Sequence, residues 1–219
     1  MVILMVGTPA VFAQPSIQGN YRILIDPAHG GTDPGVSLSG KAIEKDVTLA
    51  LAVSLKKYLE ESDRKIKVQL TRSSDKTVSI AERRNMAKAA KADLMVSLHV
   101  NAGFGPEASG YEISFPGMKH LGMASDEDIV KNMEKTKYVN NSIRLAQLIQ
   151  KNLEIIFPRK GRGIREVSVP ILTGMTTPSI CVEIGFLTNK EDKTKLLDKD
   201  IQKDIARAIG RGIHDYLNL

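Results

Sequence analysis

Two predicted strands of the sequence and a third apolar run carry polar side chains that a hydrophobic core cannot explain. The segments 22–26 and 93–98 lead into His29 and His99, and the third run contains Glu183. An unpaired carboxylate is costly to bury, so Glu183 needs a partner, and a metal ion or its water can supply one. Imidazole and carboxylate groups are ligands that zinc accepts. These residue types therefore indicate metal chemistry where the apolar segments end.

Glu44 adds a signal from a different kind of segment. It precedes Val47 by three residues and Leu51 by seven in an amphipathic stretch, so we expect it on the core-facing side of the first helical turn. An acid in that place could instead accept hydrogen bonds from amides at the helix start. In the company of two histidines, a ligand role is favoured.

Two histidines and one carboxylate form a catalytic zinc set whose fourth position is left for water. Zinc lowers the pKa of that water to about 7. A carboxylate that is not a ligand can take the proton and later deliver it to a leaving amine. Glu183 fits that second role.

The elements that must position these residues follow from the hydrophobic pattern. Strands alternate with helices, which predicts a single α/β domain with a mainly parallel (mixed) twisted sheet of about six strands and helices on both faces. Ligands of open α/β sheets bind beyond the carboxyl ends of the strands, where His29 and His99 are expected. The expected strands are 22–26, 65–70, 93–98, 111–115 and 179–184, with short extended pieces in 163–172, and the expected helices are 42–61, 79–91, 142–157 and 201–217.

The composition limits the class of protein. The chain has 219 residues, of which 42% are apolar, and this is ordinary for one domain. No apolar run is long enough for a transmembrane helix. The net charge of +6 favours anionic partners, but nucleic acid is disfavoured because 5% of residues are aromatic and Trp is absent. The single cysteine, Cys181, cannot form an internal disulfide and is expected to be buried.

The first residues resemble a leader. An apolar stretch is followed by the small residues Val11 and Ala13, which is typical of a signal-peptide core with cleavage after Ala13. A basic leader segment is missing, and an N-terminal strand is the alternative. We therefore expect residues 1–20 to be the remnant of an export signal, and the protein to act in the periplasm or cell envelope.

The whole range 22–217 resembles the zinc-dependent N-acetylmuramoyl-L-alanine amidases of the type called amidase 3. Five blocks that are typical of this family occur in order. They are Ile25-Asp26-Pro27-Ala28-His29-Gly30-Gly31, Glu44-Lys45-Asp46, Leu70-Thr71-Arg72, the segment from Ala92 to Ala102, and Val182-Glu183-Ile184-Gly185-Phe186-Leu187-Thr188-Asn189.

The resemblance implies one zinc ion per chain, held by His29, Glu44 and His99, and a catalytic role for Glu183. It also implies hydrolysis of the amide between the lactyl group of N-acetylmuramic acid and the L-alanine of the stem peptide. Peptidoglycan would be the partner, and the activity would serve cell separation, wall turnover or lysis. Two further candidates for substrate contact are Asn101 and Arg72.

The sequence departs from the family pattern in two places. Ala28 replaces a usual glycine, and a positive φ at this position would strain or re-route the loop before His29. The segment 116–140 is longer than a minimal domain needs. Some relatives carry an inserted helix that blocks the zinc until a partner displaces it, so this insert is a candidate lid on which an activator protein could act. An excursion without regulatory meaning is the alternative. The acids that could reach a metal are Asp126, Glu127, Asp128 and Glu134.

Two other functions stay open. The first is a catalytically silent wall-binding or regulatory domain, which has no chemical need for all four site residues. The second is a zinc peptidase that cuts the stem peptide, which only the family resemblance disfavours.

Overall fold

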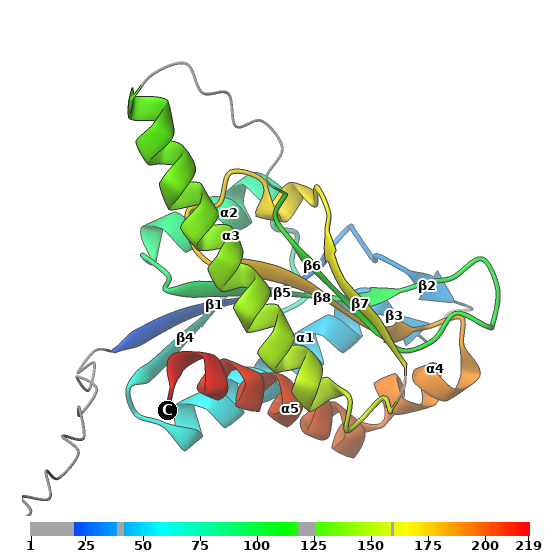
Figure 1. The fold of residues 1–219 in the computed structure, drawn as a ribbon. Helices are drawn as coiled ribbons and strands as arrows, with labels where there is room; N and C mark the ends of the chain where they lie inside the picture. The colour runs from blue at the N-terminus through cyan, green and yellow to red at the C-terminus, as the bar shows by residue number, and fades with distance from the viewer. Residues whose placement is uncertain (1–19, 39–41, 118–125, 159) are drawn as a thin grey trace, which may run out of the picture.

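The apolar runs of the sequence form one six-stranded sheet in the computed structural model, which describes residues 20–38, 42–117, 126–158 and 160–219 (Figure 1). The leader expected at 1–20 lies outside this range except for its last residue. The elements in chain order are β1 (Tyr21–Pro27), β2 (Ser37–Leu38), β3 (Ala42–Ile43), α1 (Glu44–Ser62), β4 (Ile66–Leu70), α2 (Ile80–Ala89), β5 (Leu94–Asn101), β6 (Tyr111–Phe115), α3 (Asp126–Leu153), β7 (Gly161–Glu166), a 3-10 turn η1 (Pro170–Leu172), β8 (Ser179–Phe186), α4 (Lys190–Leu197) and α5 (Lys199–Leu217).

The sheet has the strand order β4-β1-β5-β8-β6-β7. The first four strands in this order are parallel, β6 pairs antiparallel with β8, and β7 pairs parallel with β6. The predicted mixed, mainly parallel sheet is therefore confirmed. Because β1, β5 and β8 are parallel, their carboxyl ends meet at one edge of the sheet.

The two faces of the sheet are covered unequally. Helices α1, α3 and α5 pack on one face and share with it a large core that includes Leu51, Ile149 and Ile209. The other face has a small apolar cluster in which Leu24 and Met95 of the sheet meet Ala87 of α2 and residues of η1. Cys181 belongs to this cluster and is buried, as expected. Asp26, Ser97 and Glu183 also lie on this second face, so it carries polar side chains beside the apolar cluster.

Two elements differ from the sequence prediction. Helix α3 begins at Asp126 rather than at residue 142, so residues 126–140 of the insert form the first half of a 28-residue helix. This half extends beyond the sheet in Figure 1, and its sequence lacks a clear apolar stripe. Helix α4 was not expected because only Leu196 and Asp192 on it are buried.

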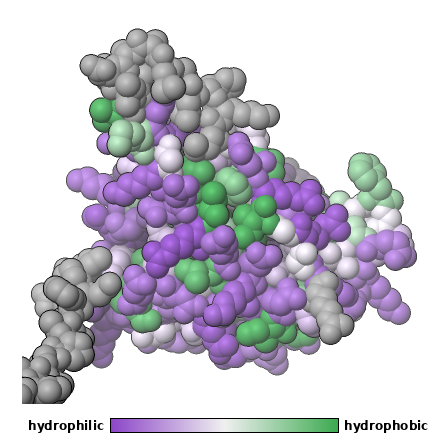
Figure 2. Space-filling model, viewed as in Figure 1, coloured by the Kyte–Doolittle hydropathy of each residue, from purple (hydrophilic) through white to green (hydrophobic). Residues whose placement is uncertain are grey.

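The surface seen in the same view is mostly hydrophilic, with separate hydrophobic patches (Figure 2). In the part of the chain that the structure describes, no helix combines the length and the apolar character needed to cross a membrane.

Candidate active site

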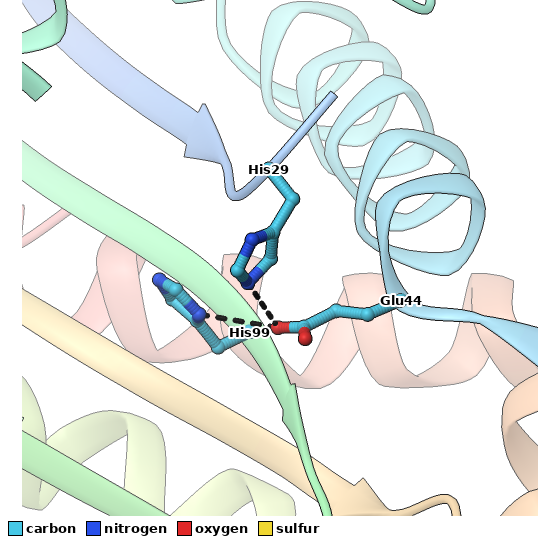
Figure 3. A group of neighbouring side chains, drawn as sticks. All are labelled: His29, Glu44 and His99. Atoms are coloured by element: carbon cyan, nitrogen blue, oxygen red, sulfur yellow. Dashed lines mark hydrogen bonds and ion pairs between the residues drawn. The ribbon is translucent and has the colours of Figure 1, made fainter. Parts of the chain in front are cut away.

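The side chains of His29, Glu44 and His99 converge from three separate elements (Figure 3). His29 lies two residues past β1, Glu44 is the first residue of α1, and His99 lies on β5. One potential ligand atom of each lies within 4.8 Å of the others, and in the described ranges this is the group found that could hold a metal ion. The two histidines and the acid singled out in the sequence therefore meet at one point.

The spacing of these atoms fits a small tetrahedral ion. His29 Nε2 and His99 Nδ1 each lie 3.1 Å from the same Oε1 atom of Glu44. Two ligands on tetrahedral zinc, with bonds of about 2.0–2.1 Å, lie about 3.3 Å apart. The set is thus consistent with zinc binding in both donor type and spacing.

The carboxylate of Glu44 is fixed by backbone amides outside its own helix. Its Oε2 accepts a hydrogen bond from the amide of Val36 at 2.9 Å, and its Oε1 accepts one from the amide of Val100 at 3.0 Å. The residue is 2% exposed. Glu44 therefore does not cap the start of α1, which was the alternative interpretation, and its free lone pairs face the two histidines.

The electrostatics favour an anion at Glu44. Burial by itself raises the pKa of this carboxyl, but hydrogen bonds from His29, His99 and two amides lower it to about 2. The hydrogen bond to Glu44 raises the pKa of His29 to about 9, against the lowering effect of burial. A metal ligand must be deprotonated, so Glu44 is ready to bind and His29 must release its proton to do so.

The loop before the first histidine takes an unexpected conformation. The positive φ lies at His29 itself, with a value of 61°, and Ala28 is outside the left-handed region. The strain considered for Ala28 therefore does not arise, and alanine is accepted at this buried position. A left-handed histidine is uncommon, and such residues persist where surrounding contacts hold them.

Asp33 is one of those contacts. Its Oδ2 lies 2.8 Å from His29 Nδ1, which leaves Nε2 directed at Glu44. A carboxylate behind a metal-binding histidine fixes the ring and its tautomer. Sequence reasoning missed Asp33, although a signal existed in an acid four residues after the histidine in the same Pro/Gly-rich loop.

Two buried arginines hold the backbone of the loop. Arg72 donates to the carbonyl oxygens of Pro27 at 3.0 Å and Ala28 at 2.8 Å. Arg83 donates to the carbonyl oxygens of Pro27 at 2.7 Å and His29 at 2.6 Å. Arg72 is 1% exposed and also donates to the carbonyl oxygen of Lys45 at 2.7 Å, so it ties the loop to the start of α1 rather than facing an open surface.

A buried acid beneath the loop completes this network. Asp26 is 1% exposed and accepts hydrogen bonds from Arg83, from Thr71 Oγ1 at 2.5 Å and from Ser97 Oγ at 2.7 Å. The charges of Asp26 and Arg83 are thus paired with each other, whereas the guanidinium of Arg72 is satisfied by carbonyl oxygens and by Thr48 Oγ1. Asp26, Arg83 and Ser97 come from three segments that are distant in sequence, and no local pattern indicated that they would meet.

Glu183 lies beside the convergent group on the next strand. It is the register partner of His99, so both side chains leave the same face of the sheet, and neighbouring strands lie about 4.8 Å apart. Burial raises the pKa of its carboxyl. A carboxylate next to the ligands with a raised pKa is suited to accept and return a proton.

The side-chain amide of Asn101 and a cavity complete the surroundings of the two histidines. Asn101 ends β5, two residues past His99 on the same face, and its Oδ1 accepts from the amide of Ala102 at 2.7 Å. A cavity of about 160 Å³ borders both histidines and is walled by η1 and by Val169. Glu134 of the insert lines a different cavity, and the side chains of 126–129 lie outside the described set.

Known proteins are similar to this chain over most of its length. A family model described as Amidase_3, N-acetylmuramoyl-L-alanine amidase, matches residues 23–215. The N-acetylmuramoyl-L-alanine amidase CwlM of Bacillus licheniformis is 30% identical over 198 residues, which cover 90% of this chain and 69% of that protein.

Solved structures are similar over the same range. The amidase AmiC2 of Nostoc punctiforme is 30% identical with a TM-score of 0.76, over 92% of this chain and 99% of that one. The CwlD amidase of Clostridioides difficile, solved in complex with the GerS lipoprotein, is 27% identical with a TM-score of 0.76, over 91% of this chain and 99% of that one.

Proposed function

The chain belongs to the Amidase_3 family of N-acetylmuramoyl-L-alanine amidases, and on that premise we propose that Glu183 carries the proton transfers beside a zinc site of His29, Glu44 and His99. The enzyme hydrolyses the amide bond between N-acetylmuramic acid and L-alanine in bacterial peptidoglycan. The observation that carries the residue assignment is the convergence of three ligand atoms with a second acid, Glu183, as register partner of His99.

The chain's own residues account for the proton movements. His29, Glu44 and His99 would hold a zinc ion, which would polarise a carbonyl group and lower the pKa of water to about 7. Glu183 takes the proton of the attacking water as the new C–O bond forms. It then gives that proton to the nitrogen of L-alanine as the C–N bond breaks, so that the peptide leaves as a neutral amine. Asp33 keeps His29 in the orientation that presents Nε2.

We assign positioning and contact roles to the other two candidates. Arg72 supports the ligand loop through the carbonyl oxygens of Pro27 and Ala28. We propose that Asn101 contacts substrate, and its support is its position at the end of β5, two residues past His99. One zinc ion per chain is the stoichiometry that the one convergent group found among the described residues supports.

The variant Glu183→Ala tests the catalytic assignment. Turnover of purified peptidoglycan should fall by about 10²–10⁴-fold, because proton transfer is lost, while zinc content is unchanged. His29→Ala should lose both zinc and turnover. Metal analysis and mass spectrometry of the released peptides are the measurements.

The control and the contrary outcomes are distinct. Glu61→Ala, at an exposed acid on α1, should leave the rate unchanged. Near-full activity of the Glu183→Ala variant would overturn the assignment. Peptides that start at L-alanine support amidase cleavage, whereas internal stem fragments would indicate the peptidase alternative, and no release would indicate a silent domain.

The location of the enzyme follows from its substrate. Peptidoglycan lies outside the cytoplasm, so the enzyme acts there, and we assign export to the leader at 1–20.

We also propose that an activator acts on the segment 116–140. Its support is the extension of α3 beyond the sheet and the lipoprotein complex of the related CwlD amidase. Deleting residues 118–137 should raise wall hydrolysis, and an unchanged or lower rate in a folded protein would argue against a lid.

A further inference from the structure

A row of charged side chains crosses the polar face of the sheet beyond Glu183. Glu112 on β6 is the register partner of Glu183, and Arg162 and Arg165 on β7 both approach Glu112. Their Nε atoms lie 3.8 Å and 3.5 Å from the same Oε2 atom of Glu112. The catalytic acid is thus followed along the sheet by one carboxylate and then by two guanidinium groups.

A bulge in β7 makes this convergence possible. Residues three apart on a regular strand point to opposite faces, so Arg162 and Arg165 would normally diverge. The register shifts between Tyr111 and Ile113, and Gly163 has a φ of 99°. The extra residue returns Arg162 to the face of Arg165, and a bulge that re-aims a side chain is frequent near active sites.

Arg162 is further fixed by an aromatic ring. Its guanidinium lies 5.1 Å from the ring centroid of Phe186, which is 4% exposed. A guanidinium over an aromatic face is held in a defined plane while its N–H edge stays available. The side chain of Arg162 is 41% exposed and that of Arg165 is 55% exposed. Both groups therefore present donors to solvent at the edge of the site.

The charges in this cluster do not balance. Two guanidinium groups face one carboxylate, and neither Nε distance is that of a short, charge-assisted hydrogen bond. Arginine favours planar anions such as carboxylates because its donors form a fixed fork. The cluster of Glu112, Arg162 and Arg165 thus leaves capacity for a second carboxylate from outside.

We infer that Arg162 and Arg165 form a subsite for a carboxylate of the departing stem peptide, and so set specificity for the acidic form of the substrate. This inference rests on the proposed function. Strands β8 and β7 are separated by β6, so the arginines lie about 10 Å from the strand of Glu183. Extended peptide spans about 3.4 Å per residue, which places the recognised carboxylate two or three residues beyond the scissile amide.

A matched pair of muropeptides tests the subsite. Both are N-acetylmuramoyl-tripeptides that end in a carboxamide on the third residue, and they differ only in a free carboxylate or a carboxamide on the second residue. The zinc-loaded wild-type enzyme should cleave the acid with a kcat/KM about tenfold higher, mainly through KM. The Arg162→Gln/Arg165→Gln variant should lose this preference and retain its rate on the amide.

A control variant and two kinds of contrary outcome distinguish failure of the subsite from failure of the proposed function. Arg207→Gln/Arg211→Gln removes the same charge from α5 and should keep the preference, which excludes a general effect of charge. Equal cleavage of both muropeptides by the wild-type enzyme would overturn the subsite, as would a variant that slows on both equally. Failure of the wild-type enzyme to release a peptide starting at L-alanine from either compound would instead reject the proposed function.

Discussion

His29 and Arg162 lie on opposite sides of the same site, and their surroundings are held by different interactions. On the side of β1, the loop carbonyls accept hydrogen bonds of 2.6–3.0 Å from the buried Arg72 and Arg83. On the side of β7, the arginines approach Glu112 at 3.5 Å and 3.8 Å and are about half exposed. One side is built from buried charges that are satisfied by an ion pair and by carbonyl oxygens, and the other from loose surface ion pairs.

The difference corresponds to what each side must hold. Metal ligands need to be placed within about 0.5 Å, which requires a packed and hydrogen-bonded support. A stem peptide can carry a carboxylate or a carboxamide, and hydrogen-bond donors that bind it must be able to move. Buried paired charges are costly to break, whereas exposed ion pairs contribute about 0–1 kcal/mol. Substitutions on the two sides should therefore differ in how much they lower stability and in whether they change zinc affinity or substrate preference.

Arg83→Met should have the larger effect on stability. It leaves the buried carboxylate of Asp26 without its cation and removes the Arg83 donor from the carbonyl oxygen of His29, so the free energy of unfolding should fall by about 3–5 kcal/mol. Zinc affinity should fall as well, because the His29 loop loses its support. Urea unfolding and zinc titration are the measurements.

Arg207→Met is the matched control for this change. Arg207 pairs with Asp204 on the surface of α5, and its loss should cost at most about 0.5 kcal/mol. Adding Asp26→Asn to Arg83→Met should recover part of the loss, since the unpaired charge is removed. Equal costs for Arg83→Met and Arg207→Met would contradict the contrast between the two sides.

Gly163→Ala should have the smaller effect. A side chain at a φ of 99° strains the bulge of β7, at a cost of about 1–3 kcal/mol, although no atom lies within 4 Å of the added Cβ. Zinc affinity should be unchanged, and the preference for the acidic muropeptide should fall because Arg162 is re-aimed. Gly105→Ala, which has open space and no positive φ, is the control. A loss of zinc affinity in Gly163→Ala would show that the two sides are coupled.

The sequence predicts the place of a site residue where that place depends only on the residue and on the strand or helix that carries it. His29 and His99 were predicted from the ends of buried strands, and Glu44 from its place on a helix face. The six-stranded sheet followed from the alternation of apolar runs with helices. These features depend on local periodicity, which the sequence displays directly.

The remaining features depend on contacts between distant segments. Asp26 and Arg83 are buried together by tertiary packing, and the bulge at Gly163 depends on the register of β6 against β7. The start of α3 was missed because its first half extends past the sheet and needs no apolar stripe. The positive φ fell on His29 rather than Ala28, which only the loop's hydrogen bonds decide.

The distribution of the ligands along the chain links metal binding to folding. Glu44 and His99 are 55 residues apart and meet only after β1, α1 and β5 have assembled. An unfolded chain therefore offers zinc no preformed site, and binding to the native state alone shifts the unfolding equilibrium. Free zinc at a thousand times its dissociation constant would add about 4 kcal/mol of stability. The zinc supply of the compartment would then determine how much of this amidase stays folded, as well as how much of it is active.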